Sequence, residues 1–388
     1  MNVTLSKTEQ ELVDRASAFA CEQVSPHAAT WEEERRMPLE TFRAAAEIGL
    51  GGLFIPRALG GLEASHAAVA RVLEEISGHC MTFAFSLMVQ NNAAGIIARN
   101  GSEQQIERYL SDLLQCKRWG AFCLTEPEVG SDAAAISTTA TKMDDGWELN
   151  GAKAWVTNGS VADLLCVYAQ TEPSQGWRGI ACFLVEGDTA GVQREPAYAL
   201  MGTHAAGTTG VLFSRCRIPD QNLLLGPGDG FKAAMVGINR ARAFIAAMCC
   251  GMVRRSLGIA LDYAHQRRAF GKPIAEFQGL QWQLADIATD LEAARSLTYE
   301  AARVLDDGNC AILESAYAKK FATRVAMKRI ADCMHVMGAV GYRADYPFGR
   351  HLANAKMSDF IDGTTGVQNM VISRQLLQST SKNWKRPP

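Results

Sequence analysis

The chain has 388 residues, of which 48% are hydrophobic and 21% are charged, a balance typical of a packed globular protein. Its 39 Lys and Arg residues against 41 Asp and Glu give a formal net charge of −2, which argues against a nucleic-acid binder that relies on a basic face. No uninterrupted apolar run has the ~18–20 residues needed to cross a bilayer, and the N-terminus resembles neither a signal nor a transit peptide. We therefore expect a protein that is neither secreted nor membrane-anchored.

The eleven cysteines carry little functional signal. They form no C-x-x-C pair, and most stand singly among apolar residues, as Cys123 and Cys166 do. The adjacent Cys249 and Cys250 suit neither an ordinary disulfide nor a zinc ligand pair. We predict reduced, buried cysteines, no metal site and a cytoplasmic location.

Residues 1 to about 120 have the hydrophobic pattern of helices. Ser6 and Glu9 form a capping box at the start of the first helix. The segment 48–61 is rich in glycine and contains Pro56, so it interrupts the helices. An alanine-rich helical pattern then returns over residues 66–118.

Residues 121 to about 230 read as β-structure. Asp145-Gly146 and Asn150-Gly151 are dipeptides typical of tight turns, which predicts two short strands around 146–151. Further strands are expected over residues 161–169, 179–185 and 211–218. The short spacing of glycine and proline favours a small β-barrel or sandwich.

Helices return from about residue 231 to the end. Leu280, Leu284, Ile287 and Leu291 mark one face of a long helix. The segment 312–337 is equally helical and poor in charge, so we expect much of it to be covered.

Five segments carry a resemblance to one enzyme family. They are CLTEPEVGSD (123–132), NGAKAWVTNG (150–159), RRAFGKP (267–273) with the following Phe277-Gln278, and the segments 334–341 and 359–368. In this order along the chain they resemble motifs of the FAD-dependent acyl-CoA dehydrogenases. The resemblance implies an α+β fold with an N-terminal all-α domain (1–120), a middle β-barrel domain (121–230) and a C-terminal four-helix bundle (231–388).

The family oxidises acyl-CoA thioesters with FAD, because no side chain accepts a hydride. Carried over by motif, the residues that bind FAD lie in every part of the chain. They are Phe122, Leu124, Thr125, Ser131, Trp155, Thr157, Arg267, Phe270, Gln278, His335, Gly338 and Thr364. Ala269, His335 and Gly366 depart from the residues that relatives usually carry. Gly226–Gly230 lacks the Lys-Ser/Thr of a phosphate loop and reads as a connection.

The residue expected to act as the base is unusual. Most family members abstract the α-proton with a glutamate in the motif E-G-T, whereas this chain has Asp362-Gly363-Thr364. A second group of relatives carries the base before an arginine of the first C-terminal helix, but here that position is Ala241. The segment 79–101, expected along the acyl end of the pocket, contains Gln90, Asn91 and Asn92 but no carboxylate.

Two interpretations of Asp362 compete. In one, Asp362 is the base, with a pKa raised by burial, and its backbone N–H helps to polarise the thioester carbonyl. In the other, Asp362 only caps a turn, and the protein is a weak or repurposed member of the family. The resemblance also assigns Ser131, Asn239, Arg242 and Gly363 to substrate binding.

The aspartate favours an unusual substrate, because family members with this residue act on alicyclic acyl-CoA. We therefore expect a 1,2-dehydrogenase of a cyclic or α-branched acyl-CoA, working as a homotetramer with an electron-transfer flavoprotein. Three alternatives stay open: a dehydrogenase of carrier-protein thioesters, a flavin oxidase, desulfinase or monooxygenase, and a flavin-binding scaffold without turnover.

Overall fold

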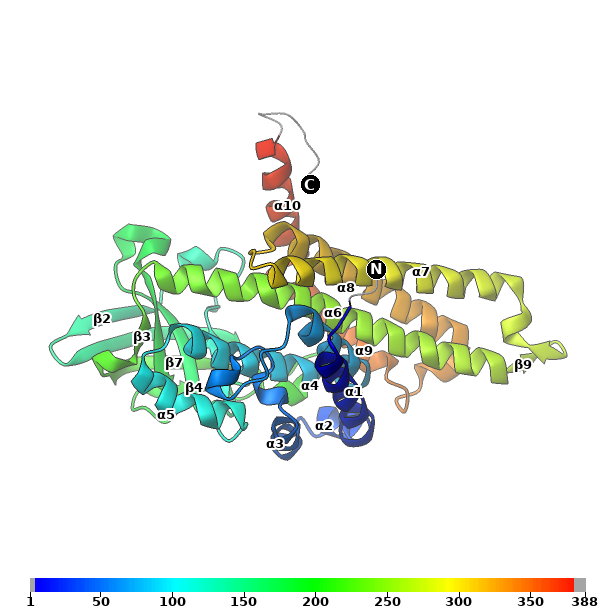
Figure 1. Cartoon of the computed structure of the whole chain (residues 1–388), viewed down its shortest axis with the longest axis horizontal. Coiled ribbons are helices and arrows are strands. Elements are labelled where there is room, and N and C mark those ends of the chain that lie inside the picture. Colours follow the sequence, from blue (N-terminus) through cyan, green and yellow to red (C-terminus); the bar gives the residue numbers. More distant parts are fainter. Residues whose placement is uncertain (1–3, 380–388) are drawn as a thin grey trace. The chain divides into compact units, whose positions relative to one another are not determined.

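The computed structural model describes residues 4–379 and divides the chain into two compact units. We call residues 1–10, 66–81 and 238–388 the helical unit, and residues 11–65 and 82–237 the sheet unit. Each unit is built from segments that are distant in sequence, and Figure 1 shows the elements in chain order. The predicted order of helices, then strands, then helices is confirmed.

The N-terminal third is helical, as predicted. Its helices are α1 (Lys7–Phe19), α2 (Ala28–Glu33), α3 (Leu39–Glu47), α4 (His66–Asn100) and α5 (Glu103–Leu114). The capping box is present, since the Glu9 N–H donates to Ser6 Oγ at 3.3 Å and the Ser6 N–H donates to the Glu9 carboxylate at 2.9 Å. The glycine-rich interruption lies between α3 and α4, and α4 itself is broken at Cys80, whose φ of −152° is not helical.

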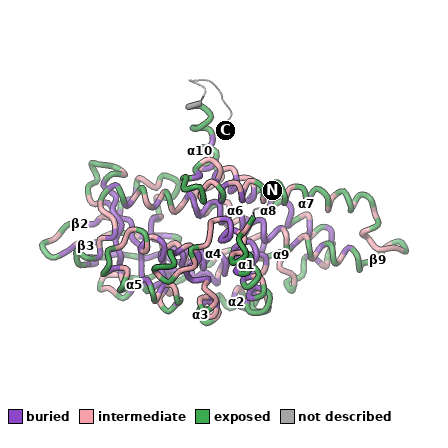
Figure 2. Tube along the Cα trace, viewed as in Figure 1, coloured by how far each residue is buried: buried purple, intermediate pink, exposed green. Residues whose placement is uncertain are grey.

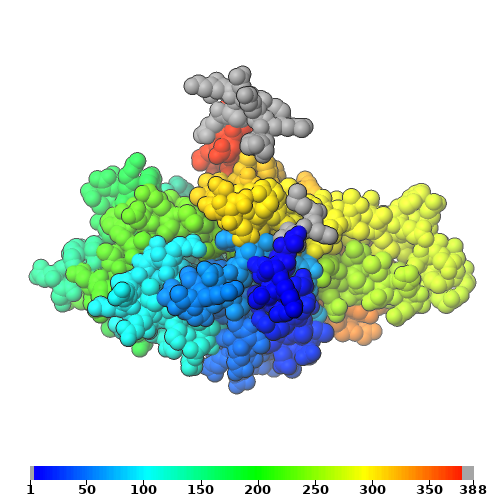
Figure 3. All heavy atoms as spheres, viewed as in Figure 1, coloured from blue at the N-terminus to red at the C-terminus, as the bar shows by residue number. Residues whose placement is uncertain are grey.

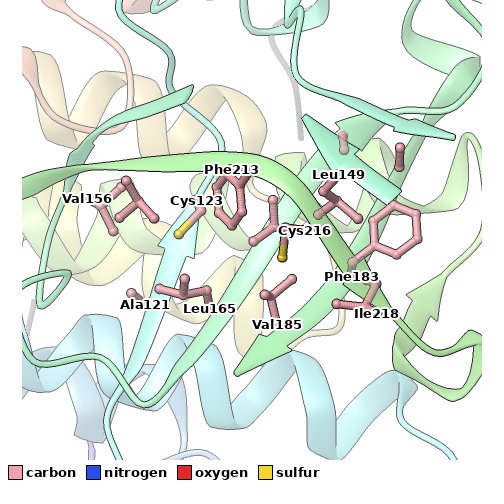
Figure 4. Packing of buried hydrophobic residues seen from close by; sticks show 14 of the residues in the cluster. Ala121, Cys123, Leu149, Val156, Leu165, Phe183, Val185, Phe213, Cys216 and Ile218 are labelled. Atoms are coloured by element: carbon pink, nitrogen blue, oxygen red, sulfur yellow. The ribbon is translucent and has the colours of Figure 1, made fainter. Parts of the chain in front are cut away.

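The middle of the chain forms one eight-stranded sheet. Its strands are β1 (Gly120–Cys123), β2 (Thr139–Met143), β3 (Gly146–Val156), β4 (Leu164–Gln170), β5 (Ile180–Glu186), β6 (Val192–Arg194), β7 (Thr209–Ile218) and β8 (Leu223–Leu225). They follow the order β6-β7-β3-β2-β4-β5-β8, with β1 parallel to β4. Side chains such as Leu149, Leu165, Phe183 and Phe213 meet in a buried core, which Figure 4 shows.

One predicted turn is wrong. Asn150-Gly151 lies inside β3, a single strand of 11 residues, rather than between two short strands. The register against β7 shifts between Leu149 and Gly151, so the dipeptide forms a bulge instead of a turn. Gly151 is required there because its φ is +146° and a Cβ would lie 2.6 Å from Thr138 Oγ1. The other predicted turn lies one residue earlier than expected: Asp144-Asp145 joins β2 to β3, and Gly146 is the first residue of β3.

The C-terminal helices belong to the helical unit from residue 238 onward. They are α6 (Asp229–Gln266), α7 (Gln278–Asp306), α8 (Ile312–Met337), α9 (Phe348–Phe360) and α10 (Thr365–Ser379), with a small hairpin of β9 (Arg268–Ala269) and β10 (Lys272–Pro273) between α6 and α7. The α8 bounds are those predicted, and thirteen of its residues are buried. Figure 2 shows this burial and the exposure of the hairpin near β9.

Two helices are long and apolar enough to cross a membrane, although neither contains an uninterrupted apolar run of that length. Both α4 and α6 contain an 18-residue window apolar enough to span a bilayer. These windows are 89% and 67% buried within the chain, as is typical of the core helices of a folded protein.

The prediction of buried cysteines is confirmed for nine of the eleven, all of which lie within the described residues. All eleven cysteines are free thiols, and only Cys21 and Cys310 are exposed. Burial raises the pKa of thiols such as Cys116, to about 12, which makes them poor nucleophiles. Residues 4–379 contain no cluster of His, Cys, Asp or Glu that could hold a metal ion.

Candidate active site

The loop between α9 and α10 has a strained backbone. Asp362 has a φ of +49° and Gly363 a φ of +91°, so two consecutive residues occupy the left-handed region. Asp tolerates this region better than most residues do. A Cβ on Gly363 would lie 3.1 Å from Arg242 Nη2 and 3.0 Å from Val367 Cγ1, so a side chain there would displace these neighbours. The loop therefore presents Asp362 in one fixed conformation.

Arg242 of α6 is one of the groups that fix this loop. Its Nε donates to the Asp362 carbonyl oxygen at 2.9 Å, and its Nη1 donates to Asn239 Oδ1 at 2.8 Å. Asn239 and Arg242 are both buried. The structure thus brings together Asn239, Arg242, Asp362 and Gly363, four residues that the sequence assigned to the site. Asn239 acts on Arg242 directly.

Two further residues bind the loop, and neither was predicted from the sequence as a site residue. Lys319 Nζ of α8 and Gln368 Nε2 of α10 each donate to the Gly363 carbonyl oxygen at 2.8 Å. Both side chains are buried. The available signal was a charged residue directly after the uncharged stretch 315–318, but the adjacent Lys320 made the pair resemble an exposed face.

The Asp362 side chain does not cap a turn. Within residues 4–379 its carboxylate forms no ion pair and no hydrogen bond, and its backbone N–H donates to no acceptor. Burial raises the pKa of Asp362, although the nearby Lys319 and Arg242 cations lower it. A partly buried carboxylate with a raised pKa and no fixed partner is suited to accept a proton.

Thr364 caps the following helix. Its Oγ1 accepts from the Val367 N–H at 3.3 Å at the start of α10. The hydroxyl proton remains available for a ligand, so the predicted role of Thr364 in cofactor binding is compatible with its structural role.

In the sheet unit, a buried ion pair holds the TEPEVGSD loop. Lys153 Nζ of β3 contacts Glu126 Oε1 at 2.7 Å and the Leu124 carbonyl oxygen at 3.0 Å. The Glu126 carboxylate also accepts from the N–H groups of Ser137 and Thr138, at 2.7 and 2.9 Å. Burial opposes ionisation of Glu126, but Lys153 and these hydrogen bonds lower its pKa to about 2. Glu126 and Lys153 thus fix the predicted flavin-contacting residues without being such residues themselves.

Several of the residues predicted to contact the flavin lie close together along β3. The Ala154 N–H donates to the Thr125 carbonyl oxygen at 2.9 Å, which places Leu124 and Thr125 next to Trp155 and Thr157. Trp155 has a φ of +58° at a second bulge of β3 and is 59% exposed. Phe122 packs on Tyr168, with ring centroids 4.9 Å apart, and Ser131 is exposed. An exposed indole held in a strained conformation fits the flat ring system of a flavin.

Arg267, Phe270 and Gln278 lie at and beside the β9–β10 hairpin, and all three are exposed. Figure 3 shows this hairpin at the right-hand end of the view. Within residues 4–379 the Arg267 guanidinium has no acidic partner, which suits a diphosphate ligand. Phe270 is 95% exposed. Arg267 and Gln278 supply exposed donors and Phe270 an exposed ring, which fits the diphosphate and aromatic parts of FAD.

The structure does not bring that hairpin to Asp362 within one chain. Arg242 and the end of α6 at Gln266 are 24 residues apart on one helix, which corresponds to about 36 Å at 1.5 Å per residue. His335 lies 16 residues along α8 from Lys319, or about 24 Å. Arg267 and His335, with Gly338 beside it, are therefore remote from Asp362 of the same chain.

The segment 79–101 needs one correction. The Gln90 amide binds Leu113 O and Gly120 N, and the Asn91 amide binds Leu50 O and Leu53 N, all at 2.7–2.9 Å. Both side chains are buried. They join α4 to neighbouring segments of the sheet unit, so they are structural residues rather than the lining of an acyl pocket.

Three family models match the chain in succession. They are the acyl-CoA dehydrogenase N-terminal domain over residues 6–117, the middle domain over 121–216 and the C-terminal domain over 228–377. Together they cover most of the chain.

Individual relatives agree with these models. An acyl-CoA dehydrogenase of Bacillus subtilis is 37% identical over 93% of this chain and 96% of its own. The mitochondrial short/branched chain specific acyl-CoA dehydrogenase of Rattus norvegicus is 35% identical over 92% of this chain and 83% of its own. The structure of butyryl-CoA dehydrogenase from Megasphaera elsdenii matches with a TM-score of 0.93 at 32% identity, over 97% of this chain and 100% of that one. The protein therefore belongs to the acyl-CoA dehydrogenase family of FAD-dependent oxidoreductases.

Proposed function

We propose that this acyl-CoA dehydrogenase forms an α,β-unsaturated thioester with Asp362 as the base that removes the α-proton. The observation that supports this most directly is the Asp362 carboxylate itself, which has a raised pKa and no partner among residues 4–379. Its backbone is held by Arg242 and, through Gly363, by Lys319 and Gln368. No other carboxylate occupies a position that the family uses for this step.

The residues of the chain have distinct tasks in this reaction. The Asp362 carboxylate takes the proton from the α-carbon, and the unused Asp362 N–H donates to the thioester carbonyl oxygen, where negative charge develops. We expect Ser131, Asn239, Arg242 and Gly363 to shape the substrate site, with Asn239 acting through Arg242. When bound, FAD supplies at its N5 the acceptor for the β-hydrogen as hydride. The residues expected to hold it are those that the motifs identified, from Phe122 to Thr364.

The substrate is proposed to be an α-branched or alicyclic acyl-CoA. Aspartate is one methylene shorter than glutamate, so its carboxylate oxygen lies roughly 1 Å further from the α-carbon of a substrate bound in the usual position. A displacement of this size can lower the rate of proton abstraction ~10²-fold. A rigid or branched acyl group offers a way to bring the α-carbon closer to the base. The short/branched chain specificity of one relative is consistent with this choice.

The assembly and its surroundings are proposed on separate grounds. Because about 36 Å of α6 separates Arg242, which contacts Asp362, from the start of the hairpin, we propose that the hairpin serves the FAD of a second copy, in a homotetramer. The electron acceptor is proposed to be an electron-transfer flavoprotein, and the location cytoplasmic, in keeping with the free thiols. Domain boundaries near residues 120 and 230 stay predictions.

A panel of thioesters tests the proposed function. Purified protein is mixed anaerobically with straight-chain, α-branched and cyclohexanecarboxyl-CoA, and the flavin absorbance is followed. We expect the branched or cyclic thioester to bleach the flavin fastest. Fastest bleaching by a straight-chain thioester would contradict the substrate class, and no bleaching by any thioester would contradict the activity.

A further inference from the structure

We infer that Lys319 and Gln368 are positioning residues for Asp362, with Lys319 also setting the pH at which Asp362 becomes a base. The inference rests on the proposed role of Asp362. It adds two residues, from α8 and α10, that no motif singled out.

The geometry of the loop supports a positioning role. Two successive carbonyl groups are held by three donors, namely Arg242 Nε on the Asp362 oxygen and Lys319 Nζ with Gln368 Nε2 on the Gly363 oxygen. These contacts come from three different helices, α6, α8 and α10. They surround Asp362, whose φ of +49° is unfavourable for a residue with a Cβ and needs support from neighbouring groups. The contacts involve only the backbone, so the Asp362 carboxylate remains available for a substrate.

The two donors differ in charge, which separates their effects. Lys319 is 1% exposed. Because an uncompensated buried cation is unfavourable, we expect its ammonium group to have a specific role. Neutral Gln368 holds the same oxygen without any electrostatic action on Asp362. Gln368 Oε1 is buried and has no partner among the described residues, so this side chain is held through its Nε2 donor alone.

The titratable groups that act on Lys319 lie on α6, on α9 and in the loop itself. Arg242 and Cys249 on α6, Asp359 on α9 and Asp362 in the loop all act on it. Burial lowers the pKa of Lys319 to about 8, against the opposing effect of Asp362. Below that pH the ammonium favours the ionised form of Asp362. Removal of the charge is therefore expected to raise the pKa of Asp362 further.

The test isolates the proton transfer from the oxidation. The holoenzyme is incubated in D2O with 3,3-dimethylbutyryl-CoA, which has α-hydrogens but no β-hydrogen and so cannot be dehydrogenated. Asp362 takes an α-proton, and a deuteron returns to the same carbon. Mass spectrometry of the thioester gives the exchange rate as a function of pH, with no net redox change.

Five variants make the assignment. Asp362→Asn is expected to abolish exchange. Lys319→Met is expected to lower the plateau rate ~10–100-fold and to move the midpoint of the pH profile to higher pH. Gln368→Leu is expected to lower the plateau and leave the midpoint unchanged, whereas Lys319→Arg, which keeps the charge, is expected to keep the wild-type midpoint. Lys320→Met, one residue from Lys319 and only partly buried, is the matched control and should behave as wild type.

The outcomes distinguish the inference from the proposed function. Exchange that persists in Asp362→Asn, or that is absent from the wild type, contradicts Asp362 as the base. Exchange lost in Asp362→Asn with Lys319→Met matching Lys320→Met overturns only the role of Lys319. If Lys319→Met does not fold, the other two variants test the inference. A wild-type plateau rate in Gln368→Leu contradicts it, and so does a shifted midpoint of the pH profile in Lys319→Arg.

Discussion

At the scale of single residues, the burial of the Asp362 carboxylate lowers the stability of the folded chain when that group is ionised. Burial raises its pKa, so ionisation is less favourable in the folded chain than in the unfolded one. The sign follows directly: this group favours the folded state below its ordinary pKa of 3.8, and that contribution is lost as the pH rises through the higher folded-state value. The ionised form of Asp362 therefore lowers the free energy of unfolding.

Asp362→Asn is accordingly expected to melt at a temperature equal to or a few degrees above that of the wild type, while losing activity. The amide keeps the size of the side chain and removes the buried charge. Thermal unfolding at pH 7.5 followed by circular dichroism measures the change. A clear decrease in melting temperature would show that the carboxylate has a structural role instead.

Gly363→Ala is expected to slow flavin reduction ~10–100-fold, because a Cβ requires the loop to shift. The new methyl group would lie within 3.2 Å of the Arg242, Val367 and Gln368 side chains, at a φ of +91°. Gly366→Ala is the matched control, since its Cβ would meet only Thr364 Oγ1 at 3.4 Å. Equal rates in the two variants would argue against a tightly held loop.

At the scale of elements, the end of β3 that is predicted to contact the flavin depends on one buried ion pair. Lys153 and Glu126 are almost fully buried, and together they connect β3, β2 and the TEPEVGSD loop. Breaking such a pair by removing one partner leaves the other charge uncompensated.

Lys153→Met is expected to destabilise the protein by about 3–5 kcal/mol and to reduce FAD content. Lys142→Met removes an exposed lysine that pairs with Asp220, so its effect should stay below about 1 kcal/mol. Urea unfolding curves and the flavin-to-protein absorbance ratio measure both. A Lys153→Met protein as stable as the control would refute the importance of this pair.

How far the sequence predicts an element depends on how local its causes are. The capping box of α1 and the bounds of α8 follow from neighbouring residues, and both predictions are confirmed. The turn predicted at Asn150-Gly151 is wrong because the glycine is needed for a different reason, a close approach to Thr138. Thr138 becomes adjacent only when β2 and β3 pair. Lys319 and Gln368 were missed for the same reason, since both reach an oxygen that is distant in sequence.

At the scale of the molecule, acid stability depends in part on two histidines of the helical unit, the buried His351 and the half-buried His79. Burial lowers the pKa of His351 to about 3 and that of His79 to about 4, with Arg255 contributing to both. The unfolded chain binds protons at these residues below about pH 6.5, whereas the folded chain does not. The stability present above pH 6.5 is therefore lost as the pH falls.

The melting temperature is expected to decrease between pH 6.5 and 4.5, a range in which Glu126 of the folded chain stays ionised. His351→Gln, which keeps a partner for Ser256, is expected to show a weaker decrease over this range. Melting curves in buffers of constant ionic strength test this. An unchanged slope in the variant would assign the acid sensitivity to other groups.

The whole molecule also shows which parts of the site the sequence can and cannot predict. The motifs identified the family, and the structure brings Arg242 to Asp362 as expected. Motifs do not tell which residues one chain can bring together, and the length of α6 separates Arg267 from Asp362.

The most direct test of the account is the rate of flavin bleaching after anaerobic mixing with the best thioester of the panel, compared between wild type and Asp362→Asn. With equal FAD content, the variant is expected to be slower by ~10²–10⁴-fold, the usual contribution of a general base. Bleaching by Asp362→Asn at the wild-type rate would contradict the assignment of Asp362 as the base.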